Sequence, residues 1–217
     1  MILKLILLFY VLFLSRLYLP VKLVFSLILL YILQDLENRS DLQRSKSLPA
    51  TLPPGTVISY SYRNLLDTSL NPLLPYRLMF SRYPHKALVV THEEKPHVLE
   101  WRYYPLKELE QYTVKTLRFG YISLIPLDSY LEIVSRHNVI FSVYHPPKTI
   151  QLEYDKERVD EIVKGKTYLT CTYFASSYLK NYLEMSDDHY PILFTPERCQ
   201  SILRKNRWKQ EYYIYNK

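Results

Sequence analysis

Glycine and cysteine are scarce in this chain, and each scarcity excludes a class of site. Of 217 residues, only three are glycine and two are cysteine. Gly-rich phosphate loops and dinucleotide fingerprints need several closely spaced glycines, and neither pattern is present. The cysteines, Cys171 and Cys199, form no CxxC pair and no disulfide framework, although a single bridge between them would remove the Cys171 thiol. The sequence therefore predicts a site that uses neither a cofactor nor a metal.

Positive charge is in excess, since the formal net charge is +7, and tyrosine is abundant at 22 residues. A basic, aromatic surface can bind nucleic acid, and the densest basic stretch is "RKNRWK", residues 204–209. No nucleic-acid motif accompanies this stretch. Attraction to anionic lipid headgroups explains the excess equally well, so we rate nucleic acid as a minor alternative among the partners.

The N-terminal segment, residues 1–33, consists mainly of two apolar runs, 5–14 and 23–33, separated by a short stretch that contains Pro20. A secretory signal has one short apolar core followed by a small-residue cleavage site, and that site is missing here. We therefore predict an uncleaved membrane anchor that binds lipid. One long tilted helix and a hairpin bent at Pro20 both remain open, because each run alone is about half the length of a simple span.

Beyond this segment, the sequence predicts a polar and proline-rich linker over residues 34–54 and a folded domain over 55–217. Alternating and β-branched stretches predict strands in the domain, and helical periodicity predicts helices between them, which together indicate an α+β fold. The predicted strands are "GTVISYSY", "HKALVVTH", "HVLEWRYY", "VIFSVYH", "TIQLEYD" and "RWKQEYYIYNK". The predicted helices before the cysteine are "LKELEQY", "PLDSYLEIVSRH" and "KERVDEIVKG", the last one capped by Gly165.

The stretch "TYLTCTYFASSYLKNYL", residues 167–183, places a cysteine at the start of a predicted helix. Thr170 or Thr172 is suited to cap this helix, which puts Cys171 at or near its N-terminus. The helix dipole and unpaired N–H groups there stabilise a thiolate. Free cysteines are nevertheless often buried and inert, and the cysteine taken alone favours that interpretation.

A series of short motifs resembles the permuted papain-like hydrolases of the NlpC superfamily. In chain order they are "GTVI", "YPHKALVV", "HVLEW", "PLDSYL", "CTYFASSYL" and "PILFTPERCQSIL", and they span residues 55–205. Bacterial and large-DNA-virus members share this order, as do the lecithin:retinol acyltransferase-like enzymes. The resemblance implies a permuted papain-like domain in which an antiparallel sheet or small barrel packs on helices.

The resemblance also assigns roles to three residues. Cys171 matches the family's nucleophile, His85 matches the base, and Glu100 matches the acidic residue that orients the imidazole. His97 is a rival for the orienting role, because the acyltransferase-like branch uses a second histidine. By strand parity, His97 and Glu100 point to opposite faces, so only one of them can serve.

Three positions depart from the family pattern. Thr56 follows Gly55 where aspartate is usual, Lys86 follows the histidine where small or apolar residues are usual, and Tyr173 stands two residues after the cysteine where polar residues are common. Tyr173 is also expected to crowd the site of the oxyanion. These changes are compatible with a domain that kept the fold and lost the activity.

Two functions of different kinds follow. The first is a membrane-anchored cysteine hydrolase or acyltransferase, a class that includes thiol proteases, acting on an amide or ester of a lipid or peptide through an acyl-thioester. The second is a structural scaffold with protein partners in a membrane-associated assembly, such as a minor capsid component at the inner membrane of a virion. The acidic stretch 187–189, "DDH", is interpreted as a loop rather than a metal site, and Cys199 as a core residue.

Overall fold

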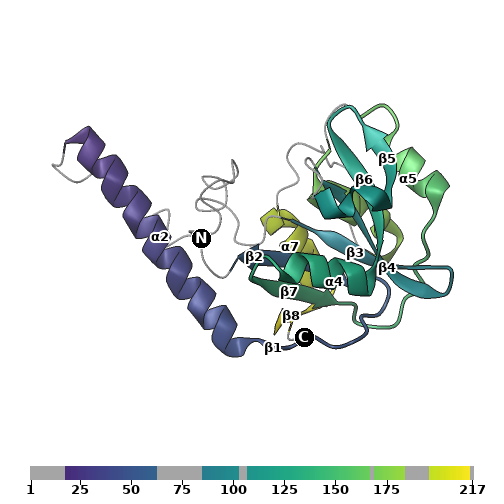
Figure 1. The fold of residues 1–217 in the computed structure, drawn as a ribbon, viewed down its shortest axis with the longest axis horizontal. Coiled ribbons are helices and arrows are strands. Elements are labelled where there is room, and N and C mark those ends of the chain that lie inside the picture. The colour runs from purple at the N-terminus through teal and green to yellow at the C-terminus, as the bar shows by residue number, and fades with distance from the viewer. Residues whose placement is uncertain (1–17, 63–84, 103–106, 167–168, 184–195, 216–217) are drawn as a thin grey trace.

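The protein is an α+β fold built on an eight-stranded mixed sheet, seen in a computed structural model (Figure 1). The structure describes residues 18–62, 85–102, 107–166, 169–183 and 196–215. The strands are β1 (Lys46–Ser47), β2 (Val57–Tyr62), β3 (Ala87–His92), β4 (Lys95–Arg102), β5 (Thr113–Leu117), β6 (Gly120–Pro126), β7 (Val139–His145) and β8 (Lys209–Ile214). The helices are α2 (Leu19–Arg44), η3 (Lys107–Tyr112), α4 (Leu127–Ser135), α5 (Lys156–Val163), α6 (Cys171–Tyr178), η4 (Lys180–Tyr182) and α7 (Pro196–Lys205).

The strand order is β1-β8-β7-β2-β3-β4-β6-β5. Neighbouring strands are antiparallel except for β1, which pairs with β8 in parallel. The described strands form an open sheet that runs from β1 at one edge to β5 at the other. The prediction of an antiparallel sheet or small barrel is thus wrong at this edge: β1 enters beside β8 and makes the sheet mixed.

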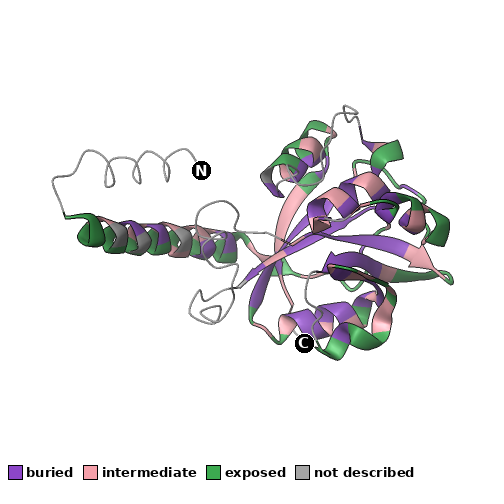
Figure 2. Cartoon of the chain, turned by 90° about the horizontal axis from the view of Figure 1, so that it is seen from above, coloured by how far each residue is buried: buried purple, intermediate pink, exposed green. Residues whose placement is uncertain are grey.

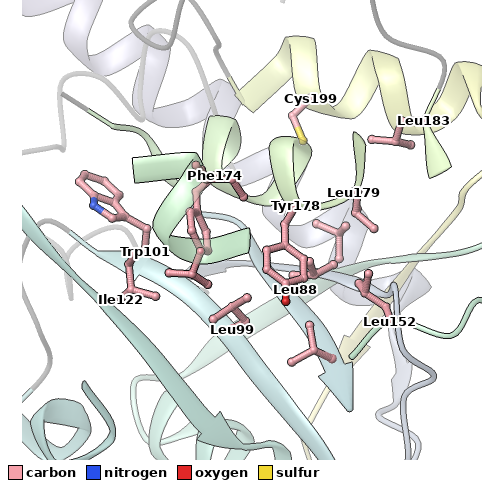
Figure 3. Close-up of a cluster of buried hydrophobic side chains, with 14 of the residues drawn as sticks. Leu88, Leu99, Trp101, Ile122, Leu152, Phe174, Tyr178, Leu179, Leu183 and Cys199 are labelled. Carbon is pink, nitrogen blue, oxygen red and sulfur yellow. The ribbon is translucent and has the colours of Figure 1, made fainter. Parts of the chain in front are cut away.

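Each face of the sheet buries its own apolar core. On one face, strand residues pack under α5, α6 and α7, and Figure 3 shows Leu88, Leu99, Phe174 and Tyr178 at the centre of this core. On the other face, strand residues pack against α4 and η3. Side chains alternate along a strand, so β2, β3 and β4 contribute to both cores. Residues two apart on these strands therefore lie on the same face of the sheet, and this applies to their polar side chains as well.

Most predicted elements are present, but the region before α5 differs. The segment "TIQLEYD" forms no strand, and its one bridge joins Glu153 to Thr91. Ile150 and Leu152 are buried in the core. Tyrosine hydroxyls from α6 and η4 donate to two carbonyls of the segment: Tyr178 to Glu153 O at 2.9 Å and Tyr182 to Gln151 O at 2.7 Å. The Leu152 carbonyl accepts from the backbone N–H of Thr91. Alternating burial thus arises without a strand ladder. Strands β5 and β6 were not predicted.

The predicted linker over residues 34–54 is wrong in both halves, because α2 occupies the first half, and β1 and the buried Leu52 join the sheet and its core in the second. Helix α2 does not end at residue 33 but continues to Arg44, and β1 follows at once. The polar part of the helix is supported locally, since Arg39 Nε lies 2.8 Å from Asp35 Oδ2, one turn earlier. Helix and sheet are therefore joined by a very short connection.

Helix α2 extends away from the sheet and is largely exposed (Figures 1 and 2). Among the described residues, all exposed large apolar side chains except Tyr18 and Val114 lie on this helix. They are Leu19, Val21, Val24, Phe25, Ile28, Tyr31, Ile32, Leu36 and Leu42. The helix is long and apolar enough to cross a membrane. The rest of the predicted anchor, residues 1–17, lies outside the described residues.

Gly120, the first residue of β6, is expected to be intolerant of a side chain. Its φ is +128°, and an added Cβ would lie 2.6 Å from the Arg102 carbonyl oxygen and 2.8 Å from the Trp101 ring. We expect Gly120→Ala to lower the free energy of unfolding by about 3 kcal/mol, through backbone strain and overpacking. Gly165→Ala is the matched control, since φ is +68° there but nothing lies within 4 Å. Urea unfolding should show a cost of about 1 kcal/mol for the control, and equal costs would contradict the packing argument.

Candidate active site

His85 lies two residues before the start of β3, and its imidazole is held by a carboxylate. Its Nε2 lies 2.7 Å from Oε2 of Glu100 on β4, and the His85 side chain is 15% exposed. The backbone is fixed as well, because Ser59 Oγ on β2 donates to the His85 carbonyl. The ring also lies beside Tyr60, at 5.7 Å between centroids. Histidine at this position is therefore set in both backbone and ring orientation.

Glu100 is a buried, ionised carboxylate. Its side chain has no exposed surface, and its Oε1 accepts from Arg102 Nε while Oε2 contacts His85. Burial opposes ionisation, but the charges of Arg102 and His85 and their hydrogen bonds outweigh it and lower the pKa of Glu100 to about 2. Glu100 is therefore a buried ion-pair partner rather than a surface one.

Arg102 was missed by sequence reasoning, although a signal for it exists. Arg102 stands two residues after Glu100 on β4, so parity places both on the same face of the sheet. Its Nη1 donates to the Tyr60 hydroxyl at 3.3 Å, and its guanidinium carbon lies 6.0 Å from the centre of the Tyr130 ring. Arg102 neutralises Glu100, which leaves the carboxylate oriented toward His85 but electrically compensated.

Cys171 is the first residue of α6, as predicted, and it is half-buried. Thr170 caps the helix: its Oγ1 accepts from the Tyr173 N–H at 3.1 Å. The thiol is hydrogen-bonded to the His85 side chain and to the backbone N–H of Lys86. Because His85 Nε2 contacts Glu100, Nδ1 is the nitrogen left for the sulfur. The structure therefore brings together Cys171, His85 and Glu100 in one chain of contacts.

The contacts among Cys171, His85 and Glu100 shift the pKa values of the cysteine and the histidine in the directions that favour a thiolate–imidazolium ion pair. Burial raises the pKa of Cys171, but the hydrogen bond and charge of His85 and the Lys86 contact outweigh it, so the net pKa is lowered. Burial and Arg102 oppose protonation of His85, but the charge of Glu100 and the bonds to Cys171 and Glu100 raise its pKa overall. A thiol that ionises readily beside a base is the arrangement that nucleophilic catalysis needs.

The rival residues lie elsewhere. His97 Nδ1 contacts the Lys95 carbonyl at 3.1 Å, and its ring packs edge-on against His92, so it does not orient His85. Cys199 is buried in the core, where Ser176 Oγ donates to its sulfur at 3.4 Å and burial raises its pKa. Both cysteines are free thiols. The predicted loop 187–189 lies outside the described residues.

The three departures from the family pattern have different surroundings. Thr56 is fully buried beside the glycine and has no hydrogen-bond partner for its hydroxyl among the described residues. The Tyr173 ring lies 4.6 Å from Lys166 Nζ and lines a surface pocket of about 470 Å³ on the α5 side of the helix. That ring is therefore directed toward α5, and the predicted crowding of the oxyanion site has no support here. Lys86 is buried directly beside the site.

Comparisons with known proteins add no relative: no family model matches the chain, and no curated protein or solved structure is significantly similar to it. Within the described ranges, no three His, Cys, Asp or Glu side chains are grouped so as to hold a metal ion. The papain-like interpretation stays a prediction, and the function of the site has to follow from its own geometry.

Proposed function

We propose that this protein is a membrane-anchored enzyme that transfers acyl groups through Cys171, as a hydrolase or acyltransferase acting on an amide or ester. One observation carries the proposal: a cysteine at a helix N-terminus is hydrogen-bonded to a histidine whose other nitrogen is held by a buried carboxylate. Nucleophile, base and orienting group in this relation are the parts that acyl transfer by a thiol requires.

The mechanism follows from the contacts. The Cys171 thiolate attacks the substrate carbonyl, and the positive end of the α6 dipole favours the negative charge that develops beside it. The His85 imidazolium gives its proton to the departing amine or alkoxide, which leaves an acyl-thioester on Cys171. His85 then accepts a proton from water or from an acceptor alcohol or amine as that nucleophile attacks the thioester. Glu100 holds the ring orientation throughout and stays ionised.

A permuted papain-like fold is part of the proposal. Its support is the order of elements: a histidine two residues before β3, a carboxylate on the adjacent strand β4, and a cysteine at the start of the later helix α6. Glu100 faces the histidine across the β3–β4 pair, with Ala87 opposite it in the register. This is the arrangement that the sequence resemblance implies.

The exposed helix α2 supports a membrane location for the substrate. Its apolar half suits lipid, and only one residue, Ser45, separates its end at Arg44 from β1 at Lys46. The sheet therefore cannot lie far from the membrane surface if the helix is embedded. We propose a lipid or a membrane-proximal peptide as the acyl donor.

We expect the full-length chain to remain in the membrane fraction after alkaline carbonate extraction. The doubly substituted variant Phe25→Glu/Ile28→Glu should be released, because each charge at the centre of an apolar helix costs about 3 kcal/mol on insertion. Leu36→Glu is the matched control on the polar half of α2 and should stay bound. Extraction of the unmodified chain would contradict the anchor.

We expect a cysteine-directed electrophile, such as an acyloxymethyl ketone, to alkylate the full-length protein at one site by displacement of its carboxylate. Cys171→Ala should abolish the labelling, whereas Cys199→Ala should leave it unchanged, because Cys199 is buried in the core. Peptide mass spectrometry checks the position. An unlabelled protein whose Cys171 thiol is shown to be free would contradict the enzyme and favour the structural scaffold.

A further inference from the structure

Lys86 is a fully buried lysine next to the candidate nucleophile. Its Nζ donates to Ser59 Oγ at 2.6 Å, and the same Ser59 hydroxyl donates to the carbonyl of His85. Its backbone N–H donates to the sulfur of Cys171. One residue thus contacts the nucleophile through its backbone and the base through a serine.

We propose that Lys86 is a positioning residue of the Cys171 site: its buried ammonium holds the sulfur as a thiolate, and through Ser59 it fixes the backbone of His85. This inference rests on the proposed acyl-transfer function and adds a residue to it. It also gives a role to the lysine that stands where the resembled family has small or apolar residues.

The charge argument is that removing an ammonium from water is costly, and an adjacent anion repays part of that cost. Glu100 is engaged by His85 and Arg102 on the opposite side of the imidazole. Two thiols lie in the electrostatic field of Lys86, and the pKa of Cys171 is lowered whereas that of Cys199 is raised. His85 comes first among the groups that lower the pKa of Cys171, and the N–H and charge of Lys86 act in the same direction.

The other titratable groups around the sulfur are few. His85 and Lys86 face it from the segment before β3, Cys199 faces it from α7, and Glu100 and Arg102 on β4 act through His85. Lys86 differs from His85 in one respect, because it does not exchange a proton during the reaction. It can therefore stabilise the thiolate when this departs in deacylation, after His85 has changed its protonation state.

The test measures the alkylation rate of Cys171 by iodoacetamide against pH, on the full-length protein in detergent and in a Cys199→Ala background. We expect Lys86→Met to raise the midpoint of this profile by at least one unit and to slow alkylation at pH 7 roughly tenfold, because the thiolate is the reactive species. Lys86→Arg should restore most of the rate. Lys95→Met, an exposed lysine on the same hairpin, is the matched control and should not shift the midpoint.

A second variant tests the effect of Lys86 on the Cys171 thiolate even if Lys86→Met fails to fold. In His85→Gln the imidazole is gone but Lys86 remains, so the Cys171 midpoint should stay below the ordinary thiol value of about 8.5. A midpoint at or above that value, or an unshifted profile in folded Lys86→Met, would overturn the role of Lys86. The proposed function fails separately, when the unmodified protein takes no acyl label on Cys171.

Discussion

Replacing His85 with glutamine is expected to slow turnover of a nitrophenyl ester by about 10²–10⁴-fold, the usual contribution of a general acid–base group. The imidazole contacts both the Cys171 thiol and Glu100, so the change removes the base that activates water in deacylation. Ser59 would still hold the backbone at this position, because its hydroxyl donates to the carbonyl of residue 85. The loss should therefore appear in turnover rather than in folding.

The matched control for this prediction is His97→Gln. His97 lies on the same hairpin but contacts Lys95 and His92 instead of the cysteine. We expect its turnover to stay within about twofold of the unmodified protein, since surface substitutions away from a site have small effects. Equal losses in the two variants would show that His85 has no special role in the reaction.

Replacing Glu100 with glutamine is expected to cost both activity and stability. The change leaves the Arg102 guanidinium buried without its counter-charge, and breaking a buried pair in this way typically costs 3–5 kcal/mol, so we expect a loss of about 4 kcal/mol. The double variant Glu100→Gln/Arg102→Met should recover much of that loss, because it removes the stranded charge. Urea unfolding of the two single variants and the double variant measures the coupling.

The pH dependence of unfolding checks the same pair. The pKa of Glu100 is about 2 in the folded protein and 4.5 without its surroundings, so its stabilising contribution is complete above pH 4.5 and is lost as the pH falls toward 2. Glu100→Gln/Arg102→Met should lose less stability over that interval than the unmodified protein. Identical losses, together with a coupling below about 1 kcal/mol, would mean that the pair resembles a surface ion pair.

The parts of the site that share one strand or one helix end could be predicted from the sequence. Parity along β4 placed Glu100 and His97 on opposite faces, and the two threonines beside Cys171 indicated a cap, which Thr170 forms. Both inferences need only local geometry, which the order of residues determines.

The parts that depend on tertiary packing could not be predicted. Lys86 looks like a solvated lysine in the sequence, and tertiary packing buries it fully. The segment before α5 alternates like a strand, but two of its carbonyls bond to hydroxyls from neighbouring helices instead of to a partner strand. The polar residues after position 33 suggested a linker, yet they extend α2, in which Asn38 and Asp41 are buried by contacts that the sequence does not reveal.

The most direct measurement is a stopped-flow burst assay on the full-length protein with a nitrophenyl ester, followed by mass spectrometry of the quenched protein. The account predicts a burst of about one equivalent of nitrophenolate per chain, with the acyl group on Cys171, followed by slower turnover limited by deacylation. Cys171→Ala should show neither the burst nor the acyl group. Absence of a burst in the unmodified protein, or an acyl group carried elsewhere than on Cys171, would contradict the account.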